Sequence, residues 1–362
     1  MEELVTKLNA ISSLLDQRGL DALLLQRVSS LAWATGGATT YINTAATNGV
    51  ASLLFTPTGR YLITNNIEAP RLQQEDKFSE QGWQFVAPHW YEAGDLVVGL
   101  TKGLKLGADG AYPGAVDLSA EVARLRVNLT GQEIARFRRL SALTAQAMQA
   151  AISAVKPGQS EHEIAALLAQ ESQRRGVQAI VNLVASDERV FNFRHPLPTP
   201  KTLERYAMLV LCGRQAGLVC SITRLVHFGP LPAELRRKSE AVARIDAAMI
   251  HATRPGRSLG EIFEITAAGY AENGFPMEWQ HHHQGGPAGY EPREYLAVPG
   301  SQDVVRAGQV FAWNPSIRGA KSEDSVLITA GGYEVLTSIE AWPTLAVEVN
   351  GETCLRPAIL ER

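Results

Sequence analysis

The chain has 362 residues, 45% of them hydrophobic and 20% charged, which is enough for two globular domains with buried cores. Its net charge of −3 gives no basic surface for nucleic acid. Its three cysteines, Cys212, Cys220 and Cys354, are too few and too scattered for a disulfide framework or a structural zinc site. The N-terminus lacks the pattern of a signal peptide, and no apolar stretch reaches the roughly 18 residues of a membrane span. We therefore expect a cytoplasmic protein that binds neither nucleic acid nor membrane.

The first third of the chain alternates predicted helices and strands. A helix over Leu4–Arg18 ends at Gly19. Five short apolar segments that follow it are predicted strands: Ala22–Leu25, Gly49–Phe55, Arg60–Ile63, Gln84–Ala87 and Leu104–Ala108. This alternation predicts an α/β domain with a mixed sheet over residues 1–127, without a Gly-rich phosphate-binding loop. A second domain, residues 128–362, is predicted to begin with a helix capped by Thr130.

The second domain contains an internal repeat. Lys156-Pro-Gly-Gln-Ser is matched 98 residues later by Arg254-Pro-Gly-Arg-Ser, and the helix stops at Gly176 and Gly274 are separated by the same 98 residues. Pro-Gly-x-Ser alone is ordinary helix punctuation, but the common spacing favours duplication. The sequence therefore predicts two halves, each made of two helices followed by strands.

The segment Arg205–Gly229 is a predicted buried β-hairpin, because two runs rich in Val, Leu, Ile and Cys flank Gly213–Gly217. With Ile222-Thr223-Arg224 on its second arm, it resembles the metal-binding hairpin of the creatinase, aminopeptidase P and prolidase superfamily. This resemblance covers essentially the whole chain. It implies an α+β protein, in which an N-terminal α/β creatinase-like domain precedes a C-terminal pita-bread domain with a pseudo-two-fold repeat. It also implies a homodimer.

That superfamily binds two metal ions through two aspartates, one histidine and two glutamates, and four of the five positions differ here. Val210 and Ser221 stand at the aspartate positions, Gly286 at the histidine, Asn314 at one glutamate, and only Glu323 is retained. Val and Gly have no ligating side chain, and Ser and Asn compensate little of the charge of a hard divalent ion. We expect neither the dinuclear metal nor another cofactor.

Creatinase is the member of this superfamily that cleaves a guanidinium C–N bond without metal. The resemblance places its acid/base histidine at His195. A histidine suits this role because it titrates near neutral pH and can protonate a leaving nitrogen. The alternative is that His195 is a structural histidine. Glu323 is expected to hold a substrate ammonium or guanidinium, or alternatively to form a salt bridge with Arg224 or Arg293. Creatinase's second cation-binding glutamate falls at Thr223, so creatine itself is not the expected substrate.

The run His281-His282-His283 invites comparison with a metal site. In a strand, His281 and His283 would share one face and His282 the other, so the three would not bind one ion. By resemblance, His282 occupies the position of a histidine that contacts substrate in the peptidases, the alternative being a polar strand without a specific role. Arg293 replaces a second such histidine, and with Arg194 and Arg224 it favours binding of a carboxylate; the alternative is that these arginines neutralise nearby acidic residues.

We draw three hypotheses. The first is a metal-independent, creatinase-like hydrolase of a small amino- or guanidino-carboxylate, with His195 and Glu323 as catalytic residues. The second is a non-catalytic member that binds a peptide or partner, and the third is a metal-dependent Xaa-Pro peptidase with an unusual site. The expected substrate contacts are His282, Arg293, Arg224, Thr223 and Asn314. A nucleophilic role for Cys212 is not favoured, because cysteine is commonly a small buried hydrophobe.

Overall fold

A computed structural model describes residues 2–76, 78–92 and 94–362. The chain folds into two compact units: unit 1 is Met1–Glu133 with Ala216–Leu218, and unit 2 is Ile134–Gln215 with Val219–Arg362. Both units combine helices and strands, which confirms the predicted α+β class. Within the described part of the chain, no helix has the length and apolarity needed to cross a membrane.

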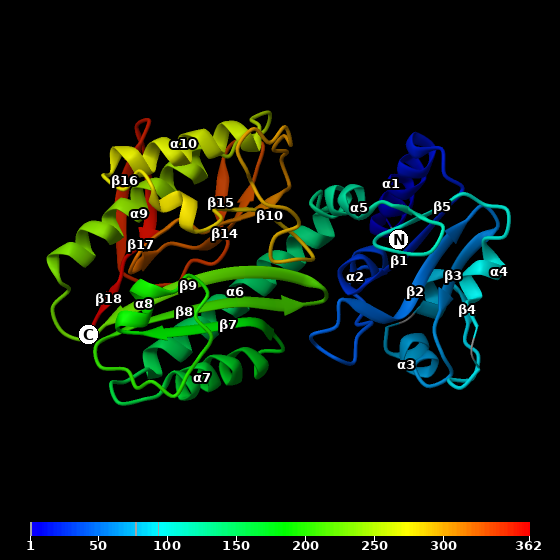
Figure 1. Cartoon of the computed structure of the whole chain (residues 1–362), viewed down its shortest axis with the longest axis horizontal. Helices are drawn as coiled ribbons and strands as arrows, with labels where there is room; N and C mark the ends of the chain where they lie inside the picture. Colours follow the sequence, from blue (N-terminus) through cyan, green and yellow to red (C-terminus); the bar gives the residue numbers. More distant parts are fainter. Residues whose placement is uncertain (1, 77, 93) are drawn as a thin grey trace. The chain divides into compact units, whose positions relative to one another are not determined.

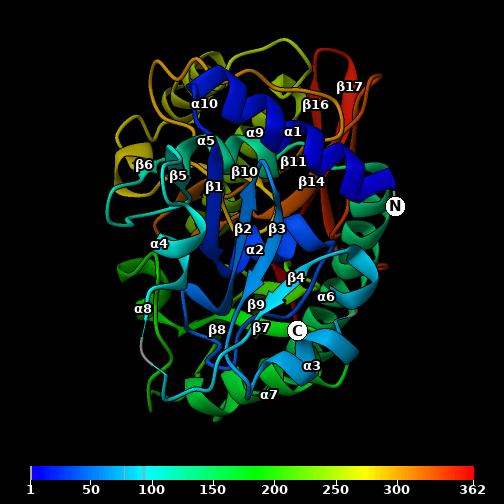
Figure 2. The ribbon, with the colours of Figure 1, turned by 90° about the vertical axis from the view of Figure 1, so that its right-hand side faces the viewer.

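Unit 1 contains a six-stranded mixed sheet with the strand order β4-β3-β2-β1-β5-β6 (Figure 2). The strands are β1 (Ala22–Arg27), β2 (Asn48–Thr56), β3 (Gly59–Ile63), β4 (Gln84–Val86), β5 (Leu106–Ala108) and β6 (Val116–Asp117). The helices are α1 (Glu2–Arg18), α2 (Val28–Thr35), α3 (Ala69–Gln74), α4 (Leu96–Leu100) and α5 (Ser119–Arg126). Strand β1 pairs antiparallel with β2 and parallel with β5, so the predicted mixed sheet is confirmed.

The helices of unit 2 repeat as the sequence predicted. They are α6 (Gly131–Ala154), α7 (Glu161–Gln173), α8 (Glu188–Asn192), α9 (Ala233–Ala252) and α10 (Leu259–Glu272). Ser160 and Ser258 each close a capping box at the start of α7 and α10. Gly176 and Gly274 follow these helices with φ of 69° and 83°, a conformation that favours glycine. The two helix pairs α6–α7 and α9–α10 are therefore equivalent (Figure 1).

Two four-stranded sheets carry the site of unit 2, in the orders β18-β9-β8-β7 and β10-β11-β14-β15. Their strands are β7 (Gln178–Ser186), β8 (Tyr206–Gln215), β9 (Leu218–His227), β18 (Leu360–Glu361), β10 (Gly285–Ala288), β11 (Val310–Trp313), β14 (Asp324–Ile328) and β15 (Tyr333–Val335). Two short hairpins complete the unit: β12 (Ser316–Ile317) with β13 (Ala320–Lys321), and β16 (Thr344–Val349) with β17 (Glu352–Pro357). Strands β8 and β9 confirm the predicted hairpin, and both are almost wholly buried.

The two sheets meet along β9, the second arm of the predicted hairpin. Thr223 of β9 forms an antiparallel bridge with Glu323, and its N–H donates to the Glu323 carbonyl at 3.1 Å. Separate hydrophobic cores lie beside the sheets. One centres on α9, α10, Phe311 and Trp313, and the other on α6, Leu209 and Ile222. The junction of the sheets is thus fixed by packing on both sides.

Candidate active site

The positions at which the resemblance expects metal ligands come together at this junction. In the antiparallel sheet, Gly286 of β10 pairs with Ala312 of β11. Trp313 of β11 pairs with Asp324 of β14. The next residues along these two strands, Asn314 and Glu323, are therefore neighbours. From the other sheet, the Ser221 N–H donates to Ser325 Oγ at 2.9 Å. The structure therefore brings together positions that lie far apart in the sequence.

The side chains at these positions do not fit two metal ions. Val210 offers no ligand atom, and a Cβ placed on Gly286 would lie 2.3 Å from the backbone carbonyl of Tyr295, which leaves no room there for a histidine. Only Glu323 supplies a carboxylate, and a hard divalent ion requires several oxygen ligands. These residues therefore lack the oxygen ligands of a dinuclear centre.

Two cationic side chains surround Glu323 instead. Arg293 Nη2 lies 2.9 Å and Lys321 Nζ 2.7 Å from its carboxylate oxygens. Thr223 donates a third hydrogen bond at 2.5 Å, and Arg293 Nη1 also donates to Ser221 Oγ at 3.0 Å. Burial alone would raise the pKa of Glu323, but Lys321 and Arg293 hold it well below its usual value. We call Arg293, Glu323 and Lys321 the cation cluster; it holds two positive charges against one negative charge.

Lys321 was not among the residues expected at the site. A signal for it exists in the sequence, because residues two apart in an extended segment share a face, and Lys321 stands two residues before Glu323. Its side chain is only 5% exposed, so its charge is directed into the protein.

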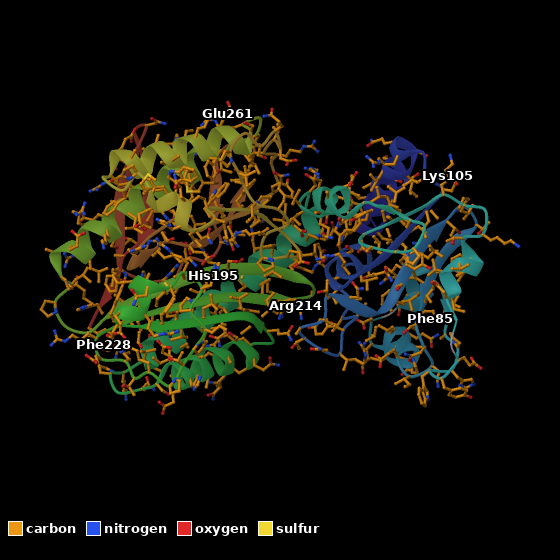
Figure 3. The ribbon with its side chains drawn as sticks, viewed as in Figure 1. Phe85, Lys105, His195, Arg214, Phe228 and Glu261 are labelled. Atoms are coloured by element: carbon orange, nitrogen blue, oxygen red, sulfur yellow. The ribbon has the colours of Figure 1, made fainter. Side chains whose placement is uncertain are left out.

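Three histidines lie beside the cation cluster. His195 Nε2 and His282 Nε2 are 3.2 Å apart, and the ring centroids of His282 and His283 are separated by 4.6 Å. His195 is exposed, His282 is buried, and His283 is half-buried. Figure 3 labels His195, which follows the short helix α8.

The prediction that these histidines form a strand is wrong. Glu278–His281 is a single 3-10 turn, and His282 then adopts an extended backbone. This change of backbone conformation brings His282 and His283 together with His195, whereas His281 is exposed and outside the group. The strand geometry, which would have put His282 and His283 on opposite faces, therefore does not apply.

The surroundings of the three rings favour their neutral forms. Burial, followed by the nearby positive charge of Lys321, lowers the pKa of His195 and lowers that of His282 to about 2. Burial and Arg293 lower the pKa of His283 to about 4. At neutral pH each ring therefore has a nitrogen lone pair that can accept a proton or bind a ligand.

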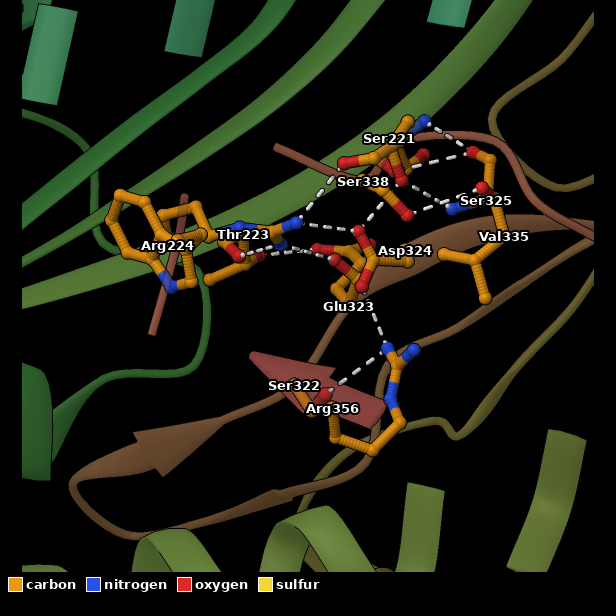
Figure 4. A network of polar contacts seen from close by, with 12 residues as sticks. Ser221, Thr223, Arg224, Ser322, Glu323, Asp324, Ser325, Val335, Ser338 and Arg356 are labelled. Carbon is orange, nitrogen blue, oxygen red and sulfur yellow. Dashed lines mark hydrogen bonds and ion pairs between the residues drawn. The ribbon is translucent and has the colours of Figure 1, made fainter. Parts of the chain in front are cut away.

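The other expected arginine contact, Arg224, belongs to a buried network around Asp324, which Figure 4 draws together with Thr223 and Glu323. Arg224 Nη2 donates to Asp324 Oδ1 at 2.8 Å, and Arg356 joins Asp324 Oδ2 and Asp246 Oδ2 at 2.7 Å each. Arg224 is 2% exposed, which places its guanidinium in the interior rather than toward solvent. We call Arg224, Asp246, Asp324 and Arg356 the buried ion network. A substrate contact through Arg224 stays a prediction that these partners do not favour.

The cysteines offer little as nucleophiles. Cys212 Sγ lies 3.4 Å from Ser221 Oγ, and burial raises the pKa of its thiol. Burial raises the pKa of Cys220 to about 12. Because the thiolate is the reactive form, neither residue is activated at neutral pH.

Comparison with known proteins identifies the lineage of this site. The family model of metallopeptidase family M24 matches residues 135–330, more than half of the chain. The chain belongs to metallopeptidase family M24. The creatinase, aminopeptidase P and prolidase resemblance is thereby confirmed, and with it the pita-bread fold.

This M24 protein is similar in sequence to uncharacterised peptidases and in fold to solved structures of dipeptidases. An uncharacterised peptidase of Staphylococcus aureus strain MW2 is 28% identical over 263 residues, which cover 69% of this chain and 73% of that protein. A Xaa-Pro dipeptidase from Bacillus anthracis superposes with a TM-score of 0.79 at 20% identity, covering 99% and 100% of the two chains.

Two further solved structures have a similar fold. The prolidase of Pyrococcus horikoshii gives a TM-score of 0.78 at 20% identity, covering 94% of this chain and 99% of that one. The N-terminal domain of the FACT complex subunit SPT16 from chickpea gives 0.73 at 14% identity, covering 94% and 97%. At these identities the likeness establishes the fold alone.

Proposed function

We propose that this M24 protein is a hydrolase that works without the dinuclear metal and cleaves a C–N bond in a small amino- or guanidino-carboxylate. The observation that carries the proposal is the cation cluster. Where the family places metal ions, this chain places Arg293 and Lys321 on one carboxylate, next to three neutral histidines. Two cations against one anion leave a net positive charge, which favours a substrate carboxylate.

Unpartnered atoms at the site support a polar ligand. Among the described residues, Arg293 Nε, His283 Nδ1 and Asn314 Oδ1 are buried without a hydrogen-bond partner. These atoms offer at least one donor and one acceptor, and an unsatisfied buried polar atom costs about 1–3 kcal/mol. A carboxylate accepts from Arg293, and the nitrogen-bearing end of the same molecule donates to Asn314.

The proposed reaction uses His195 as acid and base. His195 accepts a proton from water as the water oxygen bonds to the substrate carbon, and it then donates this proton to the leaving nitrogen as the C–N bond breaks. His282 positions the His195 ring through the Nε2–Nε2 contact of 3.2 Å. Because Arg293, Lys321 and Thr223 occupy its oxygens, Glu323 has the role of holding the two cations rather than a substrate ammonium.

Two other functions are alternatives to the hydrolase, and the experiment described next distinguishes them. One is a non-catalytic protein that binds a peptide or partner through this site, and the other is a metal-dependent Xaa-Pro peptidase. For the hydrolase, we also propose a homodimer in the cytoplasm, as the family resemblance and the sequence suggest. Light scattering giving twice the chain mass would support the dimer.

The decisive experiment compares hydrolysis by the wild type, His195→Ala and His281→Ala over a panel of guanidino, amidino and N-substituted amino acids in the presence of EDTA. We expect turnover that His195→Ala abolishes and His281→Ala retains, because His281 lies outside the histidine group. Ligand binding without turnover would support the non-catalytic protein. Hydrolysis of Xaa-Pro dipeptides that depends on added Mn²⁺ would support the peptidase.

A further inference from the structure

The three histidines have the separations of a transition-metal site. One nitrogen from each of His195, His282 and His283 lies within 4.8 Å of the others, and the Nε2 atoms of His195 and His282 are 3.2 Å apart. Two nitrogens bound about 2.0–2.1 Å from one tetrahedral Zn²⁺ are about 3.3–3.4 Å apart. The His195–His282 pair therefore already has the spacing of two ligands of one ion.

The other ring nitrogens also fit this arrangement. His282 Nδ1 lies 3.2 Å from Ser316 Oγ, which accepts a further hydrogen bond from Arg194 at 3.0 Å. Such an outer partner fixes the orientation of a metal-binding imidazole. His283 Nδ1 is buried and, among the residues described, has no hydrogen-bond partner. An unsatisfied nitrogen within the group points to a ligand.

We propose that His195, His282 and His283 bind one transition-metal ion of the Zn²⁺ class, at a position different from that of the family's dinuclear centre. Three imidazoles suit Zn²⁺, Co²⁺, Ni²⁺ or Cu²⁺ and not the hard ions Mg²⁺ or Ca²⁺. Since His195 is exposed, the ion enters from solvent and retains an open position for water or a substrate atom.

The cation cluster sets the strength of this binding. Arg293 and Lys321 repel a divalent ion, while Glu323 attracts it, so the neighbouring charge is positive overall. We therefore infer a reversible, regulatory ion rather than a structural one. A neutral imidazole that binds a metal through Nε2 carries its proton on Nδ1, so His195 then has no free lone pair to accept a proton from water, and the ion inhibits the hydrolase. This inhibition rests on the proposed function, whereas the binding does not.

The test is a calorimetric titration of untagged full-length protein with Zn²⁺, alongside the visible spectrum of the Co²⁺ form. We expect one ion per chain and the intense absorption of a tetrahedral Co²⁺ site. His283→Ala and His283→Asn are expected to weaken binding at least about tenfold, while His281→Ala, its exposed neighbour, leaves it unchanged. Ser316→Ala is expected to weaken binding about tenfold, as loss of an outer partner does.

Unchanged Zn²⁺ affinity in both folded His283 variants would overturn the proposal, and so would equal loss in His281→Ala. Absence of any Zn²⁺ binding by the wild type would overturn it as well. If the protein hydrolyses no substrate, the titration and the spectrum still show whether the three histidines bind the ion. If it does, Zn²⁺ is expected to inhibit in proportion to site occupancy, and inhibition without binding at these histidines would contradict the regulatory role.

Discussion

Glu323 and Asp324 are consecutive carboxylates that enter two different ion clusters. Asp324 belongs to the buried ion network, in which Arg224, Arg356 and Thr337 satisfy both of its oxygens. Glu323 belongs to the cation cluster, next to three histidines of which one is exposed. Because successive residues of an extended segment point to opposite faces, the side chains of Glu323 and Asp324 enter different clusters.

Both clusters are buried, but they differ in what lies beside them. The side chains of Arg224, Asp324 and Arg356 are 1–2% exposed, so this network holds two sheets and α9 together without a route for a ligand. The cation cluster adjoins an exposed histidine and has excess positive charge. We infer that the buried network maintains the inherited fold, and that the cation cluster is where the function of the family has changed.

The largest expected effect is loss of stability when the buried ion network is broken. Arg356→Met leaves Asp246 and Asp324 without a shared cation, and removal of one partner of a buried pair costs about 3–5 kcal/mol. Denaturant unfolding measures this change. Arg138→Met removes an exposed pair with Glu334 and is expected to cost about 1 kcal/mol or less. Equal costs for the two variants would contradict the distinction.

Glu323→Gln tests the cation cluster. It leaves Arg293 and Lys321 without their carboxylate, and we expect a loss of about 2–3 kcal/mol because the lost hydrogen bonds are charge-assisted. Acetate is expected to stabilise this variant more than the wild type, since Arg293 and Lys321 then lack an anionic partner and attract an anion bound beside them more strongly. Thermal unfolding with and without acetate measures both effects, and Glu334→Gln is the exposed control. The absence of an acetate effect would count against an anion site.

Gly286→Ala tests whether there is room for a side chain at the position of the family's metal-binding histidine. Its new Cβ would lie 2.3 Å from the Tyr295 carbonyl oxygen, so the backbone must shift, at a cost of about 1–3 kcal/mol. Gly331→Ala is the control, because a Cβ there meets nothing within 4 Å. Unfolding curves of the two variants give the comparison. A neutral Gly286→Ala would mean that the loop yields easily and that a histidine could be accommodated.

The histidines predict a dependence of stability on pH. His282 and His283 have folded pKa values of about 2 and about 4, below the unfolded value near 6.5, so unfolding takes up protons in acid. Stability is expected to fall as the pH decreases from about 6.5 toward 4, by at most about 1.4 kcal/mol per pH unit for each histidine. Urea unfolding of the wild type and His282→Gln/His283→Gln measures this slope. An unchanged slope in the double variant would contradict the assignment.

The contribution of Glu323 falls in a more acidic range. Its folded pKa is lowered, so its stabilisation is present above the unfolded value near 4.3 and is lost as the pH falls below that value. Between about pH 6.5 and 4.3 the slope therefore reports the histidines, whereas below about pH 4.3 Glu323 adds to the continuing contribution of His282.

Local sequence patterns predicted most of the fold. The hairpin of β8 and β9, the capping boxes at Ser160 and Ser258, and the repeat of helix pairs each depend on residues close together in the chain. Helix α2 was not predicted, because its eight buried residues show no amphipathic period.

The site was harder to predict, because its geometry depends on contacts between distant segments. The 3-10 turn at Glu278–His281 changes the directions of the following histidines, and no alternation in the sequence signals this turn. The burial of Lys321 results from its pairing with Glu323 and from the short hairpin of β12 and β13, which ends at Lys321. A resemblance identifies the ligand positions but does not show which cations replace the metal.

The number of Mn²⁺ ions bound per chain, measured by mass spectrometry after incubation and desalting, tests directly whether side-chain cations have replaced the metal ions. Mn²⁺ prefers carboxylate ligands, so it reports on the family's dinuclear site rather than on the three histidines. Since Arg293 and Lys321 occupy the surroundings of the single carboxylate, we predict far less than one ion per chain. Two bound ions per chain would contradict the replacement of metal by side-chain cations.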